Sequence, residues 1–201
     1  MALVGDIERR AARFTITGGT GAGKSSLARR LVHDLARPNE ADRVFYGDAA
    51  LAASLAGIDD AAAREHLVSV RGYGVVLEDG RRRGGALDVD GAVIVVDARA
   101  GLDAHAHAAI AEAGDTQAPH LIVAVNKMDL AGYEYDVFKR VRAEVAEAAA
   151  DRASGVAVVP VSAWFGDNVV SRGDRIDWYP GTTLAEFLAA AAGVTRARRS
   201  G

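Results

Sequence analysis

The residues of this chain that are best suited to chemistry form a glycine-rich stretch that ends in a lysine and serines. The stretch matches the pattern G-x-x-x-x-G-K-S, and we predict that these positions contact a nucleotide: Gly18, Gly19, Thr20, Gly21, Ala22, Gly23, Lys24, Ser25 and Ser26. Glycines let the backbone curl so that successive N–H groups face an anion. The Lys24 ammonium would then reach the β- and γ-phosphates, and the Ser25 hydroxyl would bind Mg²⁺. The alternative is an ordinary glycine-rich turn between a strand and a helix.

A second motif, Asn126-Lys127-Met128-Asp129, has the chemistry to recognise a guanine base. The Asp129 carboxylate can accept hydrogen bonds from both guanine N1–H and the exocyclic amine. Adenine lacks that amine and presents an acceptor at N1, so it would leave the carboxylate unpaired. Lysine occurs only at Lys24, Lys127 and Lys139, and two of these three lie in the motifs. On its own, the tetrapeptide is also compatible with a strand-to-helix turn capped by an aspartate.

The composition limits the partners and the location of the protein. Its 201 residues fit one domain with a buried core, and there are no cysteines for disulfides, thiol catalysis or a zinc site. The net charge of -3 gives no reason to expect nucleic acid or an anionic membrane as a partner. The segment from Met1 to Arg13 is charged and has no apolar leader, and no apolar run approaches membrane-spanning length. We therefore expect a cytoplasmic protein.

The elements that must position the two motifs are predicted from the spacing of apolar residues. Short apolar runs predict strands at 14–17, 73–77, 92–96, 121–125 and 156–159. Helices are predicted at 24–37, 103–113 and 133–150, with two short ones within the Ala-rich stretch 40–67. Thr183 and Glu186 form a capping box for a last helix that ends at Ala192. Alternating strands and helices indicate an α/β fold with a mainly parallel sheet, a P-loop NTPase three-layer sandwich.

Several further segments carry a resemblance to a known family. They are Asp97-Ala98-Arg99, Asn126 to Leu130, Pro160-Val161-Ser162-Ala163, Gly166 to Val170, Trp178-Tyr179 and Gly181 to Leu184. Together with the glycine-rich stretch, they resemble the translation-factor class of GTPases. The resemblance is strongest to the GTPase domain of the large subunit of bacterial sulfate adenylyltransferase, a relative of elongation factor Tu. It covers 14–35 and 90–192 and is absent between these ranges.

The resemblance implies roles for individual residues and a domain organisation. Asn126 would bond guanine N7, Lys127 would pack over the base and ribose, and Ser162-Ala163, followed by Trp164, would place a backbone N–H at O6. Trp178 and Tyr179 are expected to pack within a long loop rather than touch the nucleotide. The implied organisation is an N-terminal extension at 1–13, a P-loop GTPase-like domain at 14–192 and a basic, disordered tail at 193–201.

The resemblance also implies a function. GTP or GDP and Mg²⁺ would be the cofactors, and the activity would be GTP hydrolysis that drives sulfate activation. The implied protein partner is the separate catalytic subunit of sulfate adenylyltransferase. Two alternatives stay open: a guanine-nucleotide-binding regulator without hydrolysis, and a small P-loop kinase. A kinase would have no use for a base-specific carboxylate at Asp129.

The sequence departs from this family between the two regions of resemblance. The switch I threonine and the Asp-Thr-Pro-Gly-His segment of the family are missing, and the nearest counterpart of switch I, Val70 to Gly74, has glycine where threonine is expected. We predict that Asp79 replaces the aspartate that binds Mg²⁺ through water, and that Arg81 to Arg83 form a solvated turn. No catalytic residue is assigned. Because hydrolysis needs a positioned water, we expect it to be slow.

Overall fold

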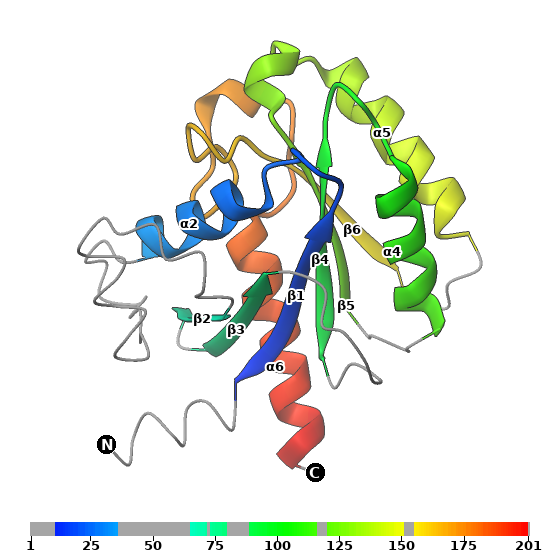
Figure 1. The fold of residues 1–201 in the computed structure, drawn as a ribbon. Helices are drawn as coiled ribbons and strands as arrows, with labels where there is room; N and C mark the ends of the chain where they lie inside the picture. Colours follow the sequence, from blue (N-terminus) through cyan, green and yellow to red (C-terminus); the bar gives the residue numbers. More distant parts are fainter. Residues whose placement is uncertain are drawn as a thin grey trace.

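The chain folds around a six-stranded sheet with the strand order β2-β3-β1-β4-β5-β6 (Figure 1). We describe it from a computed structural model, which covers residues 11–35, 65–71, 73–79, 89–115, 120–150 and 155–200. The strands are β1 (Ala12–Gly18), β2 (Glu65–Val70), β3 (Tyr73–Asp79), β4 (Gly91–Asp97), β5 (His120–Asn126) and β6 (Val156–Pro160). Neighbouring strands are parallel except β2, which runs antiparallel to β3. The predicted mainly parallel sheet is therefore confirmed.

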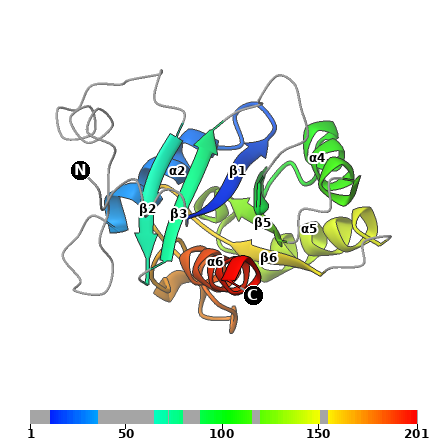
Figure 2. The same ribbon diagram turned by 90° about the horizontal axis from the view of Figure 1, so that it is seen from below.

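Helices cover both faces of this sheet, which gives the predicted three layers (Figures 1 and 2). The first pair, α2 (Lys24–Leu35) and α6 (Leu184–Ser200), packs on one face. The second pair, α4 (Ala104–Asp115) and α5 (Tyr135–Ala148), packs on the other. Two short 3₁₀ helices, η1 (Met128–Ala131) and η2 (Asp174–Ile176), lie in the connections. In the part of the chain that the structure describes, no helix has the length and apolarity needed to cross a bilayer.

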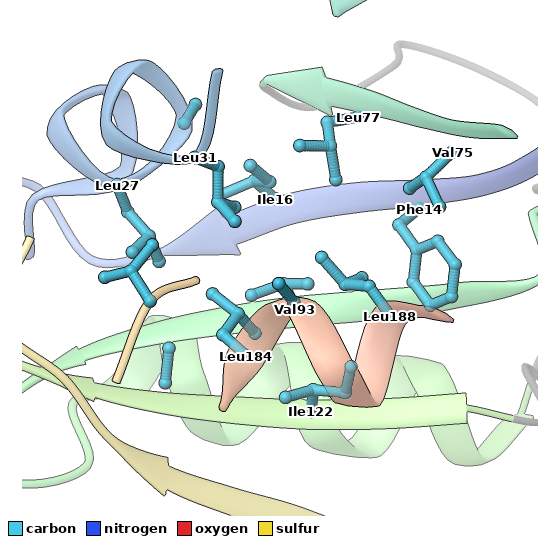
Figure 3. Packing of buried hydrophobic residues seen from close by; sticks show 14 of the residues in the cluster. Phe14, Ile16, Leu27, Leu31, Val75, Leu77, Val93, Ile122, Leu184 and Leu188 are labelled. Atoms are coloured by element: carbon cyan, nitrogen blue, oxygen red, sulfur yellow. The ribbon is translucent and has the colours of Figure 1, made fainter. Parts of the chain in front are cut away.

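Each face of the sheet buries its own apolar cluster. In β4, Val93 and Val95 belong to the cluster beneath α2 and α6, whereas Ile94 and Val96 belong to the cluster beneath α4 and α5. Successive strand residues point to opposite faces, so a strand covered on both sides must be apolar at every position. Figure 3 shows the first cluster, in which Leu184 and Leu188 of α6 face the sheet.

Three elements differ from the sequence prediction. Residues 65–70, predicted as partly helical within 40–67, form strand β2 because they pair with β3; the rest of that stretch lies outside the described residues. The helix predicted at 133–150 is present as α5, which is two residues shorter at each end. The last helix does not end at Ala192 but continues to Ser200, so most of the tail predicted as disordered is helical.

The direction of β2 also corrects the prediction for switch I. Val70 pairs with Tyr73, and β3 runs parallel to β1 with Ala12 opposite Val75, so this connection lies at the edge of the sheet away from the glycine-rich loop. Val70 to Gly74 is therefore not a counterpart of switch I. Because β2 is antiparallel, the chain enters it at Glu65 on the same edge as the loop. Residues 36–64, which lead into β2 from this edge, lie outside the described residues.

Candidate nucleotide-binding site

The glycine-rich segment forms a loop between β1 and α2 at the carboxyl edge of the sheet. Positive φ angles of 137°, 78° and 97° at Gly18, Gly21 and Gly23 curl its backbone. Helix α2 begins at Lys24, whose Nζ donates to the carbonyls of Gly18 at 3.0 Å and Gly19 at 2.8 Å. The loop thus brings together backbone amides, a helix N-terminus and an ammonium group, an arrangement suited to an anion.

The residues predicted to accompany the loop lie at the same edge. Ser25 and Ser26 occupy the exposed first turn of α2, Thr20 is exposed, and Ala22 is buried. Asp79 ends β3, where its Cα pairs with Ile16 of β1, and its side chain lies outside what the structure describes. Among the described side chains, no group of three or more His, Cys, Asp or Glu residues could hold a metal ion.

Asn126, the last residue of β5, connects the glycine-rich loop to the loop that contains Ala163. Its Nδ2 donates to Ala22 O at 2.9 Å, and its Oδ1 accepts from Ala163 N–H at 3.0 Å. The side chain is buried, with 1% exposed. A Cβ added at Gly23 would overlap Asn126 Nδ2, and Gly23 also has a positive φ, so only glycine fits that position.

Lys127 makes a parallel connection one residue later. It adopts a left-handed backbone conformation with φ 64°, and its Nζ donates to Gly21 O at 2.5 Å and to Asp97 Oδ2 at 2.9 Å. Asp97 lies opposite Asn126 in the register of β4 and β5. Hydrogen bonds from Arg99, and then from Lys127, hold the pKa of the Asp97 carboxyl well below its usual range. Asp97 therefore remains an anion that anchors the Lys127 ammonium beside the loop.

Asp129 is held by the 162–166 loop, which we define as Ser162 to Gly166. The Ser162 Oγ donates to Asp129 Oδ1 at 2.7 Å and accepts from Phe165 N–H at 3.2 Å. Ala163 N–H bonds Asn126, and the amides of Ser162 and Gly166 bond backbone carbonyls. Within the described residues, the Trp164 amide is the one in this loop that makes no hydrogen bond. The Trp164 side chain is 78% exposed.

Residues 80–193 match the family model of the elongation factor Tu GTP binding domain. The chain belongs to this family. It is 41% identical over 107 residues to elongation factor 1-alpha of Thermococcus gammatolerans, covering 52% of this chain and 24% of the relative. It is 34% identical over 205 residues to sulfate adenylyltransferase subunit 1 of Cellvibrio japonicus, covering 88% of this chain and 43% of the relative.

A solved structure also has this fold. Sup35 complexed with GDP superposes with a TM-score of 0.66 and 23% identity, covering 89% of this chain and 44% of that one. The chain thus spans less than half the length of each of these three proteins. What it shares with them is the GTP-binding domain of the elongation factor Tu family, and the predicted membership of the translation-factor class is confirmed.

Trp178 and Tyr179 pack as predicted for this family member. The Trp178 indole N–H donates to Tyr133 O at 2.8 Å, and its ring centroid lies 5.3 Å from that of Tyr135 and 5.4 Å from that of Phe138. Tyr179 packs edge-on against Phe138 at 5.9 Å. These contacts show that the two aromatic side chains pack against α5 and the residues just before it.

Sequence reasoning missed some residues that shape the site. Asp103 precedes α4 and its Oδ1 accepts from Ala106 N–H at 2.8 Å, while a Cβ added at Gly19 would overlap its carboxylate. An aspartate ahead of a helical pattern indicates a helix cap, but not a contact with a distant loop. Arg30 on α2, which contacts the carbonyls of Trp164 and Phe165, carries no sequence signal at all.

Proposed function

We propose that this chain binds GDP and GTP, with the phosphates in the loop from Gly18 to Ser26 and the guanine beside Asp129. The observation that carries the proposal is the pair of hydrogen bonds from Asn126 Nδ2 to Ala22 O and from Lys127 Nζ to Gly21 O. A nucleotide has its base at one end and its phosphates at the other. A nucleotide site therefore needs its base-binding and phosphate-binding residues at a fixed distance from each other. Membership of the elongation factor Tu GTP-binding domain family supports the same assignment.

Each base contact has a candidate donor or acceptor. The Asp129 carboxylate would accept from guanine N1–H and the exocyclic amine, with Ser162 keeping it in place. Asn126 Nδ2 carries a second hydrogen that can reach N7 while the first bonds Ala22 O. Because Ala163 N–H already bonds Asn126 Oδ1, we assign O6 to the Trp164 N–H, next to Ala163 in the 162–166 loop. The Lys127 stem would lie along the base and ribose.

The phosphates and Mg²⁺ would be held at the start of α2. Lys24 would exchange its two carbonyl acceptors for β- and γ-phosphate oxygens, which form stronger, charge-assisted hydrogen bonds. The donor set fits Mg²⁺, a hard cation that combines one or two protein oxygens with phosphate oxygens and water. The Ser25 hydroxyl and Asp79 are the residues that would hold it. The ion would neutralise charge on the phosphates.

We further propose that GTP hydrolysis by this chain is slow. The segment that enters β2 from the site edge has no threonine, since the chain contains none between Thr20 and Thr116. No histidine lies between His66 and His105, where the family places its water-positioning residue after the third strand. Without these groups, the attacking water would lack a side chain to orient it.

We also propose that the chain has a role in sulfate activation. Likeness to sulfate adenylyltransferase subunit 1 over most of the chain supports a partnership with the catalytic subunit of that enzyme. A regulator that binds GTP without hydrolysing it is the second candidate, favoured by the missing switch residues. The bond that fixes Asp129 to Ser162 argues against a small P-loop kinase, which needs no carboxylate for guanine.

Titration with GDP and ADP tests the binding proposal. GDP should bind about five- to 150-fold more tightly, because ADP would leave the carboxylate unpaired at a cost of about 1–3 kcal/mol. Lys24→Ala should weaken GDP binding strongly, whereas Lys139→Ala, at an exposed position of α5, should not. Equal affinities for GDP and ADP would reject guanine recognition.

Single-turnover GTP hydrolysis with Mg²⁺ tests the proposals of slow hydrolysis and of a role in sulfate activation. We expect a slow rate for the chain alone. A rate like that of a competent translational GTPase would reject the slow-hydrolysis proposal. Acceleration by a sulfate adenylyltransferase catalytic subunit would support the sulfate role, and no acceleration would favour the regulator.

A further inference from the structure

Arg30 lies on α2, the helix that follows the glycine-rich loop, and its side chain contacts the 162–166 loop. Its Nη1 donates to Trp164 O at 3.1 Å and its Nη2 donates to Phe165 O at 3.0 Å, across 134 and 135 residues of sequence. Two donors of one planar guanidinium bind two successive carbonyls, so the contact fixes the orientation of the loop as well as its distance.

The remaining contact of Arg30 holds its guanidinium in this orientation. Nε donates to Asp34 Oδ2 at 2.7 Å, one turn further along α2. The Arg30 and Asp34 side chains are 25% and 12% exposed, so the pair is mostly shielded from water. Asp34 therefore orients the guanidinium from within α2, and the 162–166 loop meets donors that are already in place.

The loop is shaped to accept the arginine. Gly166 has a φ of 86°, and a Cβ added there would overlap the Arg30 guanidinium. A side chain at this position would be strained and would also push the arginine away. The far end of the loop is held separately, since Asp167 accepts from Tyr133 Oη at 2.8 Å and from Arg175 Nε at 3.1 Å. In the described part of α2, Arg30 is the residue that donates hydrogen bonds to the Trp164 and Phe165 carbonyls.

We infer that Arg30 is a positioning residue for guanine recognition. It keeps the Trp164 N–H at the place where O6 of the base would lie, without touching the nucleotide itself. Helix α2 begins at Lys24, so one rigid element sets the phosphate contacts and, through Arg30, the O6 contact. This inference rests on the proposed function, because it assumes that the site holds guanine.

The affinity test compares GDP with 6-thio-GDP, in which a weaker sulfur acceptor replaces O6. The variant is Arg30→Met, which keeps the length of the side chain, and the control is Arg29→Met, at an exposed arginine of the same helix. For Arg30→Met we expect GDP affinity to fall about tenfold and 6-thio-GDP affinity to change much less, where tenfold is about 1.4 kcal/mol. The control should keep the wild-type ratio. Equal losses for both nucleotides, or no loss, would overturn the inference.

A second test needs no nucleotide and separates this inference from the proposed function. The chain has two tryptophans, so Trp178→Phe leaves Trp164 as the one fluorescent reporter on the loop. Adding Arg30→Met should cause a loss of residual Trp164 anisotropy in time-resolved measurements, with the circular dichroism spectrum unchanged. Unchanged anisotropy would overturn the inference. Failure of the wild type to prefer GDP over ADP would instead reject the proposed function, and the anisotropy would still decide whether Arg30 restrains the loop.

Discussion

Replacing Asp129 with asparagine should change which base the site accepts. The Ser162 hydroxyl donates to Asp129 Oδ1 and accepts from Phe165 N–H, so its single proton is committed to residue 129. In Asp129→Asn, the amide oxygen should therefore stay on the Ser162 side, and the NH₂ group should face the base. A donor would then meet the exocyclic amine of guanine, whereas the O2 carbonyl of xanthine can accept from it.

The size of the effect follows from the hydrogen bonds that are lost. Guanine would offer two donors to the carboxylate, and a hydrogen bond to a charged group is worth about 1.5–3 kcal/mol. Asp129 is partly exposed, which favours the lower end of the range for each bond. Together they give about 3 kcal/mol, or roughly a hundredfold in GDP affinity.

Isothermal titration with GDP and xanthosine diphosphate measures this change. The matched control is Asp136→Asn, which removes the same charge from an exposed position in the first turn of α5. We expect GDP to weaken and xanthosine diphosphate to gain in Asp129→Asn, and neither to change in the control. If Asp129→Asn binds GDP as tightly as the wild type, Asp129 does not read the base.

Three further predictions concern stability. Leu188→Ala, at a fully buried position of α6, should lower the free energy of unfolding in urea by about 2–5 kcal/mol, and a loss within error would contradict the packing. Thr183→Ala removes the hydroxyl that accepts from Glu186 N–H at 3.3 Å and should cost about 1 kcal/mol in thermal unfolding; an unchanged Tm would argue against the cap. Asp97 has a folded pKa below its usual 3.8, so its stabilising contribution is complete above that value and is lost as pH falls toward the folded pKa. The difference in unfolding free energy between wild type and Asp97→Asn should thus stay constant from about pH 7 to 5 and shrink below about pH 4, and a constant difference at all pH values would refute it.

The central strands can be predicted from sequence because each is buried on both faces. Runs such as Ala92 to Val96 leave no other interpretation once the flanking helices are recognised. Strand β2 could not be predicted, because its residues 65–70 owe their structure to pairing with β3 rather than to their own pattern. The extension of α6 was missed because Gly193 resembles a helix end, yet Gly193 lies inside the helix, where an added Cβ would be 3.3 Å from the Tyr73 ring.

The candidate site likewise has residues that the sequence predicts and residues that it does not. Asn126, Lys127 and Asp129 are predictable as a group because their chemistry is local to one tetrapeptide. Their partners are not, since Asp97 and Ser162 come from other strands and loops and meet them only through the sheet register. Arg30 shows the limit most clearly, because an arginine on a helix is by default a solvated side chain.

Helix α6 has a consequence for how the protein is made. It is the last helix along the chain, and it contacts β1, β2, β3 and β5. A ribosome releases β1 early, but the face of the sheet that carries Phe14 and Ile16 has no complete cover until α6 leaves the exit tunnel. The contacts that close this core link the two extremes of the described sequence, which makes them slow to form. We therefore expect the nascent chain to expose an apolar sheet face, and to need protection from aggregation, until α6 has been synthesised.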